Sequence, residues 1–188
     1  HFHLNRNGRF IDAAKDFKNA GGTNVVLVHC PDFSAPPTTR LGHRESYQNT
    51  IDMADSVRKQ VGLGVRVVLG PHPAAFAHQF IKWVDEDGDL GREKAMQNYR
   101  DSIDEAAAFY HEGKAHAIGE VGRPHWEVSN EIWNLSNELL LETMKLAAND
   151  GFALQLHVEG ELESTYLDMA AMASKAGLAK DRLVRHYS

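Results

Sequence analysis

The stretch AHAIGEVGRPH, residues 115–125, decides the fold of this chain. It is a short apolar run that ends in one acidic residue, Glu120, and passes into a polar loop. A strand without alternating polar residues is typical of a parallel sheet covered on both faces. The same pattern, with a histidine at the strand end, recurs in TNVVLVHCPD (23–32), VRVVLGPHP (65–73), FALQLHVEG (152–160) and DRLVRHYS (181–188).

Amphipathic helices are predicted between these strands. In residues 44–64 the apolar side chains of Tyr47, Ile51 and Ala54 follow the helical period, and Gly62 supplies a stop. Further helices are predicted at 11–22, 92–113, 130–151 and 161–177. The order is one helix, four strand–helix units and a last strand. Such repeats indicate an α/β fold, either a doubly wound sheet or a (β/α)₈ barrel.

The bulk composition limits the functional class. The chain has 188 residues, 43% of them hydrophobic, a net charge of −6 and one cysteine, Cys30. One cysteine rules out an internal disulfide, and a reducing, cytoplasmic setting is predicted. No apolar run approaches the ~20 residues of a membrane helix, so no membrane partner is expected. The negative charge argues against a broad nucleic-acid footprint, although not against an enzyme that grips a few phosphates.

Imidazoles and one carboxylate follow the ends of successive strands. In parallel α/β folds these ends gather on one rim, where reactive groups meet. His1 and His3 precede the first helix, where an earlier strand would end, and in an extended chain they share one face. Histidine with carboxylate suits Zn²⁺ and related ions. The strand-end residues are His29, His72, Glu120, His157 and His186.

Each of these residues also has a simpler interpretation. His1 and His3 could be the remnant of a tag, and His29 and His72 could be hydrogen-bonding loop residues. Cys30 fits a small packed side chain better than a nucleophile. The ordered series of ligand types, rather than any one residue, favours a metal centre.

Five segments in order resemble the TatD-related branch of the amidohydrolase superfamily. HFH (1–3) is similar to its His-x-His motif, LGPHP (69–73) to its Gly-x-His-Pro segment, and AIGEVG (117–122) to its Ile-Gly-Glu-x-Gly motif. LQLHVEG (154–160) and HYS (186–188) resemble the histidine segments of its fifth and sixth strands. The resemblance implies a TIM barrel of which this chain covers about strands 2–6. We therefore expect a single barrel domain over residues 1–188, incomplete at both ends and lacking strand 1 and strands 7–8.

The resemblance also implies the metal ligands. His1 and His3 would hold one divalent ion, Glu120 would bridge two, and His157 and His186 would hold the second. Zn²⁺ is expected, with Mg²⁺ or Mn²⁺ as alternatives. The family's general-base aspartate would lie on strand 8, outside this chain. We expect His72, Arg123 and His125, on loops of the same rim, to contact substrate.

The function implied is that of a metal-dependent hydrolase that uses a metal-activated water. A phosphodiester, as in a DNase, or a related ester or amide is the expected substrate, presented by a small molecule or a nucleic-acid end. The family's Gly-Leu-Asp is replaced here by Gly122-Arg123-Pro124, which indicates a distinct subfamily. A phosphoesterase of the polymerase-and-histidinol-phosphatase type and a non-catalytic metal- or ligand-binding barrel remain alternatives. The sequence leaves the oligomeric state open.

Overall fold

The structure, a computed structural model, describes residues 1–160 and 163–186. Its helices are α1 (Phe10–Asn19), α2 (Arg40–Val61), α3 (Pro73–Asp87), α4 (Asp89–His111), α5 (Asn130–Asp150), α6 (Glu163–Ala176) and a 3₁₀ turn, η1 (Lys180–Arg182). Its strands are β1 (Asn24–Val28), β2 (Gly64–Leu69), β3 (Ala117–Gly122), β4 (Leu154–His157) and β5 (Leu183–Arg185).

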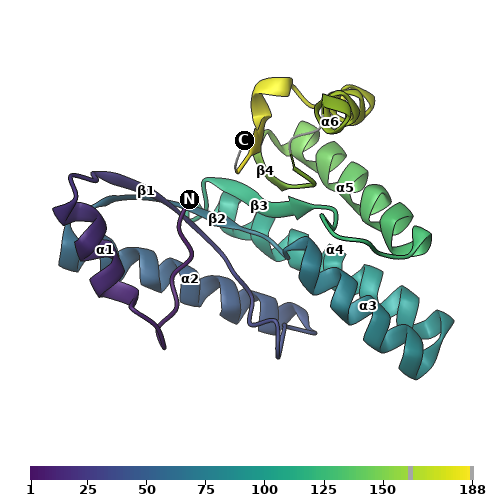
Figure 1. Cartoon of the computed structure of the whole chain (residues 1–188), viewed down its shortest axis with the longest axis horizontal. Helices are drawn as coiled ribbons and strands as arrows, with labels where there is room; N and C mark the ends of the chain where they lie inside the picture. Colours follow the sequence, from purple (N-terminus) through teal and green to yellow (C-terminus); the bar gives the residue numbers. More distant parts are fainter. Residues whose placement is uncertain (161–162, 187–188) are drawn as a thin grey trace.

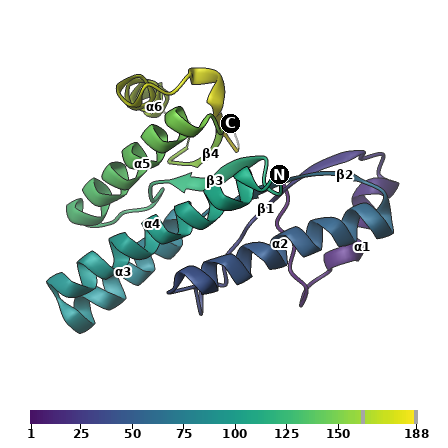
Figure 2. The same cartoon turned by 180° about the vertical axis from the view of Figure 1, so that it is seen from behind.

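The five strands are all parallel and lie side by side in chain order, β1-β2-β3-β4-β5. Successive helices also contact one another, α1 with α2, α2 with α4, α4 with α5 and α5 with α6. Figures 1 and 2 show this outer layer following the curled sheet. A doubly wound sheet reverses its strand order at a switch point, whereas a barrel wall does not. The expected partial (β/α)₈ barrel is confirmed.

The first residues of the chain lie alongside β1. Phe2 forms a parallel bridge with Leu27: its N–H donates to the Val26 carbonyl (2.8 Å), and its carbonyl accepts from the Val28 N–H (2.9 Å). This places His1 and His3 where a strand preceding β1 would end. The His-x-His motif thereby joins the same rim as the other strand ends.

Local signals explain where the helices begin and end. The Thr39 hydroxyl accepts from the Gly42 N–H at the start of α2, and the Ser129 hydroxyl accepts from the Ile132 N–H at the start of α5. These are typical N-caps. The helix α2 ends at Gly62 in the left-handed conformation (φ 73°), which glycine adopts at little cost. The predicted stripe of α2, which includes Tyr47 and Ile51, is buried.

One helix differs from the sequence-based expectation. The connection from β2 to β3 contains two helices rather than one, because α3 precedes α4 and packs against it as a hairpin turned at Gly88. Its buried side chains Phe76, Phe80 and Trp83 recur at helical spacing, and Pro73 occupies its first turn. The signal for α3 was therefore present in residues 73–87. Within the described residues, no helix has the length and apolar character needed to cross a bilayer.

Gly70, which follows the carboxyl end of β2, lets that end of the strand lie close to the middle of β3. A Cβ added to Gly70 would lie 2.7 Å from the backbone carbonyl of Gly119, the residue before Glu120. We expect Gly70→Ala to lower the free energy of unfolding by about 1–3 kcal/mol, because backbone must move to admit the methyl group. Urea unfolding measures this. Gly8→Ala, whose Cβ would meet only ordinary contacts at 3.5 Å, is the matched control; equal stability of the two variants would contradict the packing described.

Candidate metal centre

Backbone hydrogen bonds hold the strand ends level with one another. The His72 N–H donates to the Glu120 carbonyl (3.0 Å), and the Arg123 N–H donates to the His157 carbonyl (3.1 Å). The His186 N–H donates to the Leu156 carbonyl (3.3 Å). These bonds continue the parallel ladder into the loops, so side chains from distant parts of the sequence meet above the sheet.

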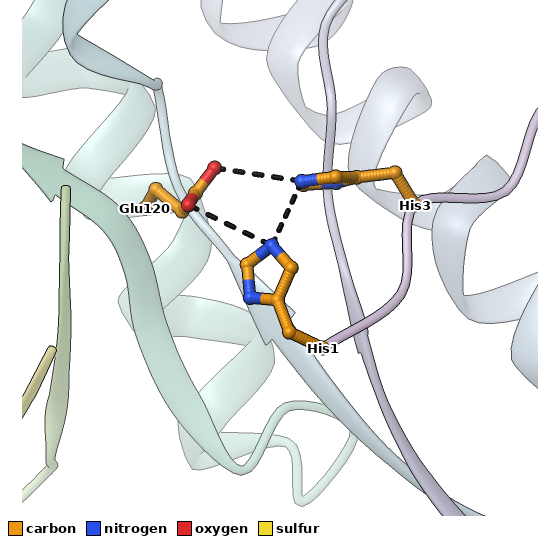
Figure 3. A group of neighbouring side chains, drawn as sticks. All are labelled: His1, His3 and Glu120. Atoms are coloured by element: carbon orange, nitrogen blue, oxygen red, sulfur yellow. Dashed lines mark hydrogen bonds and ion pairs between the residues drawn. The ribbon is translucent and has the colours of Figure 1, made fainter. Parts of the chain in front are cut away.

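Glu120 lies at the middle of this meeting point and is 1% exposed. Figure 3 shows its carboxylate facing the rings of His1 and His3. Five imidazole nitrogens lie within 3.7 Å of its two oxygens. They are His1 Nε2 (3.7 Å), His3 Nε2 (3.7 Å), His72 Nε2 (3.4 Å), His157 Nδ1 (3.3 Å) and His186 Nε2 (3.3 Å).

The electrostatics of this cluster favour an ionised Glu120 carboxylate beside the neutral imidazoles of His72 and His186. Burial acts to raise the pKa of Glu120, but the hydrogen bond with His157 and the nearby histidines outweigh it, and the pKa lies below its ordinary value. Burial lowers the pKa of His72 to about 4 and also lowers that of His186. Near neutral pH the cluster therefore offers one buried negative charge and several lone pairs. A divalent cation satisfies both.

Two of the histidines are held in the tautomer that a metal ligand requires. His3 Nδ1 lies 3.1 Å from the Val28 carbonyl oxygen, and His186 Nδ1 lies 2.9 Å from the Leu156 carbonyl oxygen. A carbonyl oxygen only accepts, so each Nδ1 carries the proton. Each Nε2 then presents a lone pair toward Glu120. In metal sites, a hydrogen bond from the other ring nitrogen to a carbonyl oxygen orients a histidine ligand in this way. These residues fit a bound divalent ion.

His1 completes the first group of ligands. Its Nε2 lies 2.8 Å from His3 Nε2, and ligand atoms of His1, His3 and Glu120 all lie within 4.8 Å of one another. Such spacing is compatible with a shared ion at ~2.0–2.2 Å per bond. The assignment of the ligands stays a prediction.

His72 differs from the other histidines. Its Nδ1 accepts from the Ala74 N–H (3.1 Å), so in the neutral ring its Nε2 carries the proton and can donate toward Glu120 Oε2. The backbone is left-handed (φ 61°), which is costly for a residue with a side chain. The group His72, Glu120 and His157 also has metal-like spacing. The hydrogen bond to Ala74 favours His72 as a donor beside the centre, which suits the predicted substrate contact.

His125 and Arg123, the other two predicted substrate residues, are placed differently. His125 is exposed, and its Nδ1 lies 2.7 Å from His157 Nε2 at the edge of the cluster. The Arg123 side chain is buried and its guanidinium is used internally. It donates to both oxygens of Glu159, to Asn137 (2.8 Å) and to Asp168 (2.6 Å), and it stacks on Trp133. The geometry therefore favours a structural role for Arg123 over the predicted substrate contact.

A polar cavity of about 730 Å³ opens beside His3. Its wall is formed by the chain after the His-x-His motif, by the loop after β1 and by one side of α2. The side chains that line it include Asn5, Arg6, Asn7, Asp32, Ser34 and Asn49. Sequence reasoning did not single out these residues, because each is an ordinary polar loop or helix residue until the fold brings them together.

Comparison with known proteins supports the grouping described above. The chain matches the family described as TatD related DNase over residues 1–188. The chain belongs to the TatD-related DNase family. This membership agrees with the order of the strand-end motifs.

A relative from Methanocaldococcus jannaschii is 30% identical over 175 residues. That protein is described only as uncharacterized, and the matched region covers 93% of this chain and 58% of the relative. The chain thus spans less than two thirds of the length of this relative. No solved structure matches the chain significantly. A TatD-related chain whose relative is uncharacterized is consistent with the distinct subfamily that the Gly122-Arg123-Pro124 segment indicates.

Arg123, Glu159, Asn137 and Asp168 are here named the Arg123 cluster, and a substitution of Arg123 tests its role. We expect Arg123→Met to lower the free energy of unfolding by about 2 kcal/mol, because the charge-assisted hydrogen bonds of the buried guanidinium are lost, while Asp168, which is half exposed, can be hydrated. Arg9→Met, which removes an exposed ion pair with Asp16, should cost less than about 1 kcal/mol. Chemical unfolding measures both. A stable Arg123→Met protein with a raised KM for anionic substrates would instead restore the substrate role.

A buried histidine near the centre generates a second test. His29 is 3% exposed and hydrogen-bonds Thr50, and burial, assisted by His43, lowers its pKa from 6.5 to about 3. Between these pH values only the unfolded chain takes up the proton. The contribution of His29 to the free energy of unfolding is therefore fully present above pH 6.5. Below that pH it falls by about 1.4 kcal/mol per pH unit.

We expect His29→Gln to reduce the slope of the free energy of unfolding against pH by about 1.4 kcal/mol per pH unit in this acid range. Urea unfolding of the metal-free protein between pH 7.5 and roughly pH 5 gives the two slopes, with the exposed His78→Gln variant as control. Parallel slopes for wild type and His29→Gln would contradict the assignment.

Proposed function

We propose that this chain provides the binuclear metal centre of a hydrolase that cleaves a phosphodiester. The observation that carries the proposal is Glu120, a buried carboxylate surrounded by five imidazole nitrogens within 3.7 Å. His1 and His3 would hold one ion, and His157 and His186 the other. Glu120 would bridge both, since imidazole nitrogens face each of its oxygens: those of His1, His157 and His186 lie near Oε1, and those of His3 and His72 lie near Oε2.

Zn²⁺ is the proposed ion, because a mixed set of imidazole and carboxylate ligands suits it. When bound, the two ions would supply Lewis acidity and a water molecule activated for attack. The chain's own residues would prepare the site. The Val28 and Leu156 carbonyls orient His3 and His186, and His72 presents an N–H at its Nε2. This donor could bind a substrate oxygen that carries developing negative charge.

The proposed substrate is a nucleic-acid end or a small phosphodiester. The polar cavity beside His3 is lined by Asn5, Arg6 and Asn49, and Arg6 donates to Asn49 Oδ1 (2.7 Å). Guanidinium and amide groups of this kind suit a phosphate and a sugar. The net charge of −6 argues against a long positively charged groove that follows a nucleic-acid backbone. The end of a strand therefore suits this protein better as a substrate than a continuous duplex. The family description, TatD related DNase, points the same way. A cytoplasmic location remains a prediction.

Replacement of the bridging carboxylate tests the proposal directly. We expect Glu120→Gln to lose at least one bound metal ion and to reduce phosphodiester hydrolysis about 100-fold or more, because the amide cannot neutralise two cations. Metal content is measured by mass spectrometry of the dialysed protein, and hydrolysis with an oligonucleotide and with a chromogenic diester.

Glu127→Gln is the matched control, since Glu127 is an exposed acid in the loop that follows β3. It should keep both the metal content and the rate of hydrolysis. Full metal content and near-normal turnover in Glu120→Gln would overturn the proposed centre.

A further inference from the structure

Six aromatic rings form a closed circuit at the mouth of the metal centre. Starting at Phe33, each ring centroid lies 4.6–6.5 Å from the next. The circuit runs Phe33, His72, His157, His125, Trp126, His78 and back to Phe33. Its inner half belongs to the cluster around Glu120. Its outer half, Phe33, His78 and Trp126, is here named the aromatic rim.

The aromatic rim faces solvent. Phe33 is 40% exposed, Trp126 is 37% exposed, and His78 is exposed as well. The three residues come from different elements: the loop after β1, the helix α3 and the loop after β3. Exposed single apolar side chains are ordinary on protein surfaces, but a group gathered around a polar site indicates a binding surface.

A buried polar network holds the loop that carries Phe33. Gln79 and Asn98 both donate to the Pro37 carbonyl, at 2.9 and 3.1 Å, and Asn98 also donates to Gln79 (3.1 Å). His43 Nε2 lies 3.0 Å from Asn98 Oδ1. These side chains come from α2, α3 and α4, so three helices fix the end of one loop.

The Arg123 cluster holds the other side. Arg123 lies three residues before Trp126 and ties the start of this loop to Glu159, Asn137 and Asp168. His125 is fixed further by its contact with His157 (2.7 Å). Both loops that present the exposed rings are therefore anchored by buried polar groups. Rings held in place before binding lose little entropy when a ligand stacks on them.

We propose that the aromatic rim stacks a flat aromatic ring of the substrate, a nucleobase, next to the phosphoester that is cleaved. The inference rests on the proposed function, because the metal centre is what places the phosphoester beside the rim. Stacking tolerates any base, since every base has a π face, and it needs no positive track. That property suits a site on a protein with a net charge of −6.

The test compares two ligands that share a sugar phosphate and differ in the base. Adenosine 5′-monophosphate and ribose 5-phosphate are titrated into the Zn²⁺-loaded intact protein and into the metal-free protein by calorimetry. We expect the nucleotide to bind about fivefold or more tightly than ribose phosphate. Phe33→Ala and Trp126→Ala should each remove most of that preference, whereas Trp126→Phe should retain it. Leu90→Ala, an exposed apolar residue near the turn between α3 and α4, is the control.

The outcomes separate the rim from the metal centre. Equal affinity for the two ligands, or an unchanged preference in both alanine variants, would overturn the rim proposal. Stronger binding of both ligands with Zn²⁺ would at the same time support the centre. A base preference that is lost in the alanine variants, with affinities for both ligands that do not rise when Zn²⁺ is present, would support the rim and count against the metal proposal.

Discussion

The structure depends on one constraint, the burial of the Glu120 carboxylate. A carboxylate that is 1% exposed has lost nearly all its water, and an isolated charge in that position would be expensive. Its surroundings lower its pKa rather than raise it, so the group is kept ionised. Burial lowers the pKa of two of the imidazoles that face it, those of His72 and His186, which favours their neutral form. A centre of this kind is organised to receive positive charge, which explains why so many lone pairs converge on it.

The barrel wall brings these side chains together through the arrangement of its strands. Parallel strands in sequential order bring their carboxyl ends to one rim, and the backbone ladder continues past β2, β3 and β5 into the residues that follow them. Carbonyl groups at these ends then orient His3 and His186. Farther out, buried polar clusters around Arg123 and Pro37 hold the loops. The residues around Glu120 carry the motifs of the family. The carbonyl groups that orient them and the polar clusters that hold the loops lie outside these motifs.

The sequence predicted the residues around Glu120 well, because strand-end position and residue type are both local properties. His1, His3, Glu120, His157 and His186 were named from such patterns, and the structure brings them together, although their role as ligands stays a prediction. Arg123 shows what such local patterns leave out, and its predicted contact with substrate stays a prediction. Its partners Glu159 and Asp168 lie 36 and 45 residues away, so nothing near it in the chain revealed that its guanidinium was already occupied. The aromatic rim was missed for the same reason, since it exists only when three separate elements meet.

The most direct measurement is anomalous X-ray diffraction at the zinc absorption edge from crystals of the Zn²⁺-loaded protein. We predict two anomalous peaks, each about 2.0–2.2 Å from an oxygen of Glu120. One peak would be bound by Nε2 of His1 and His3, and the other by His157 and His186. Absence of an anomalous peak within bonding distance of Glu120, with zinc bound elsewhere on the protein, would contradict it.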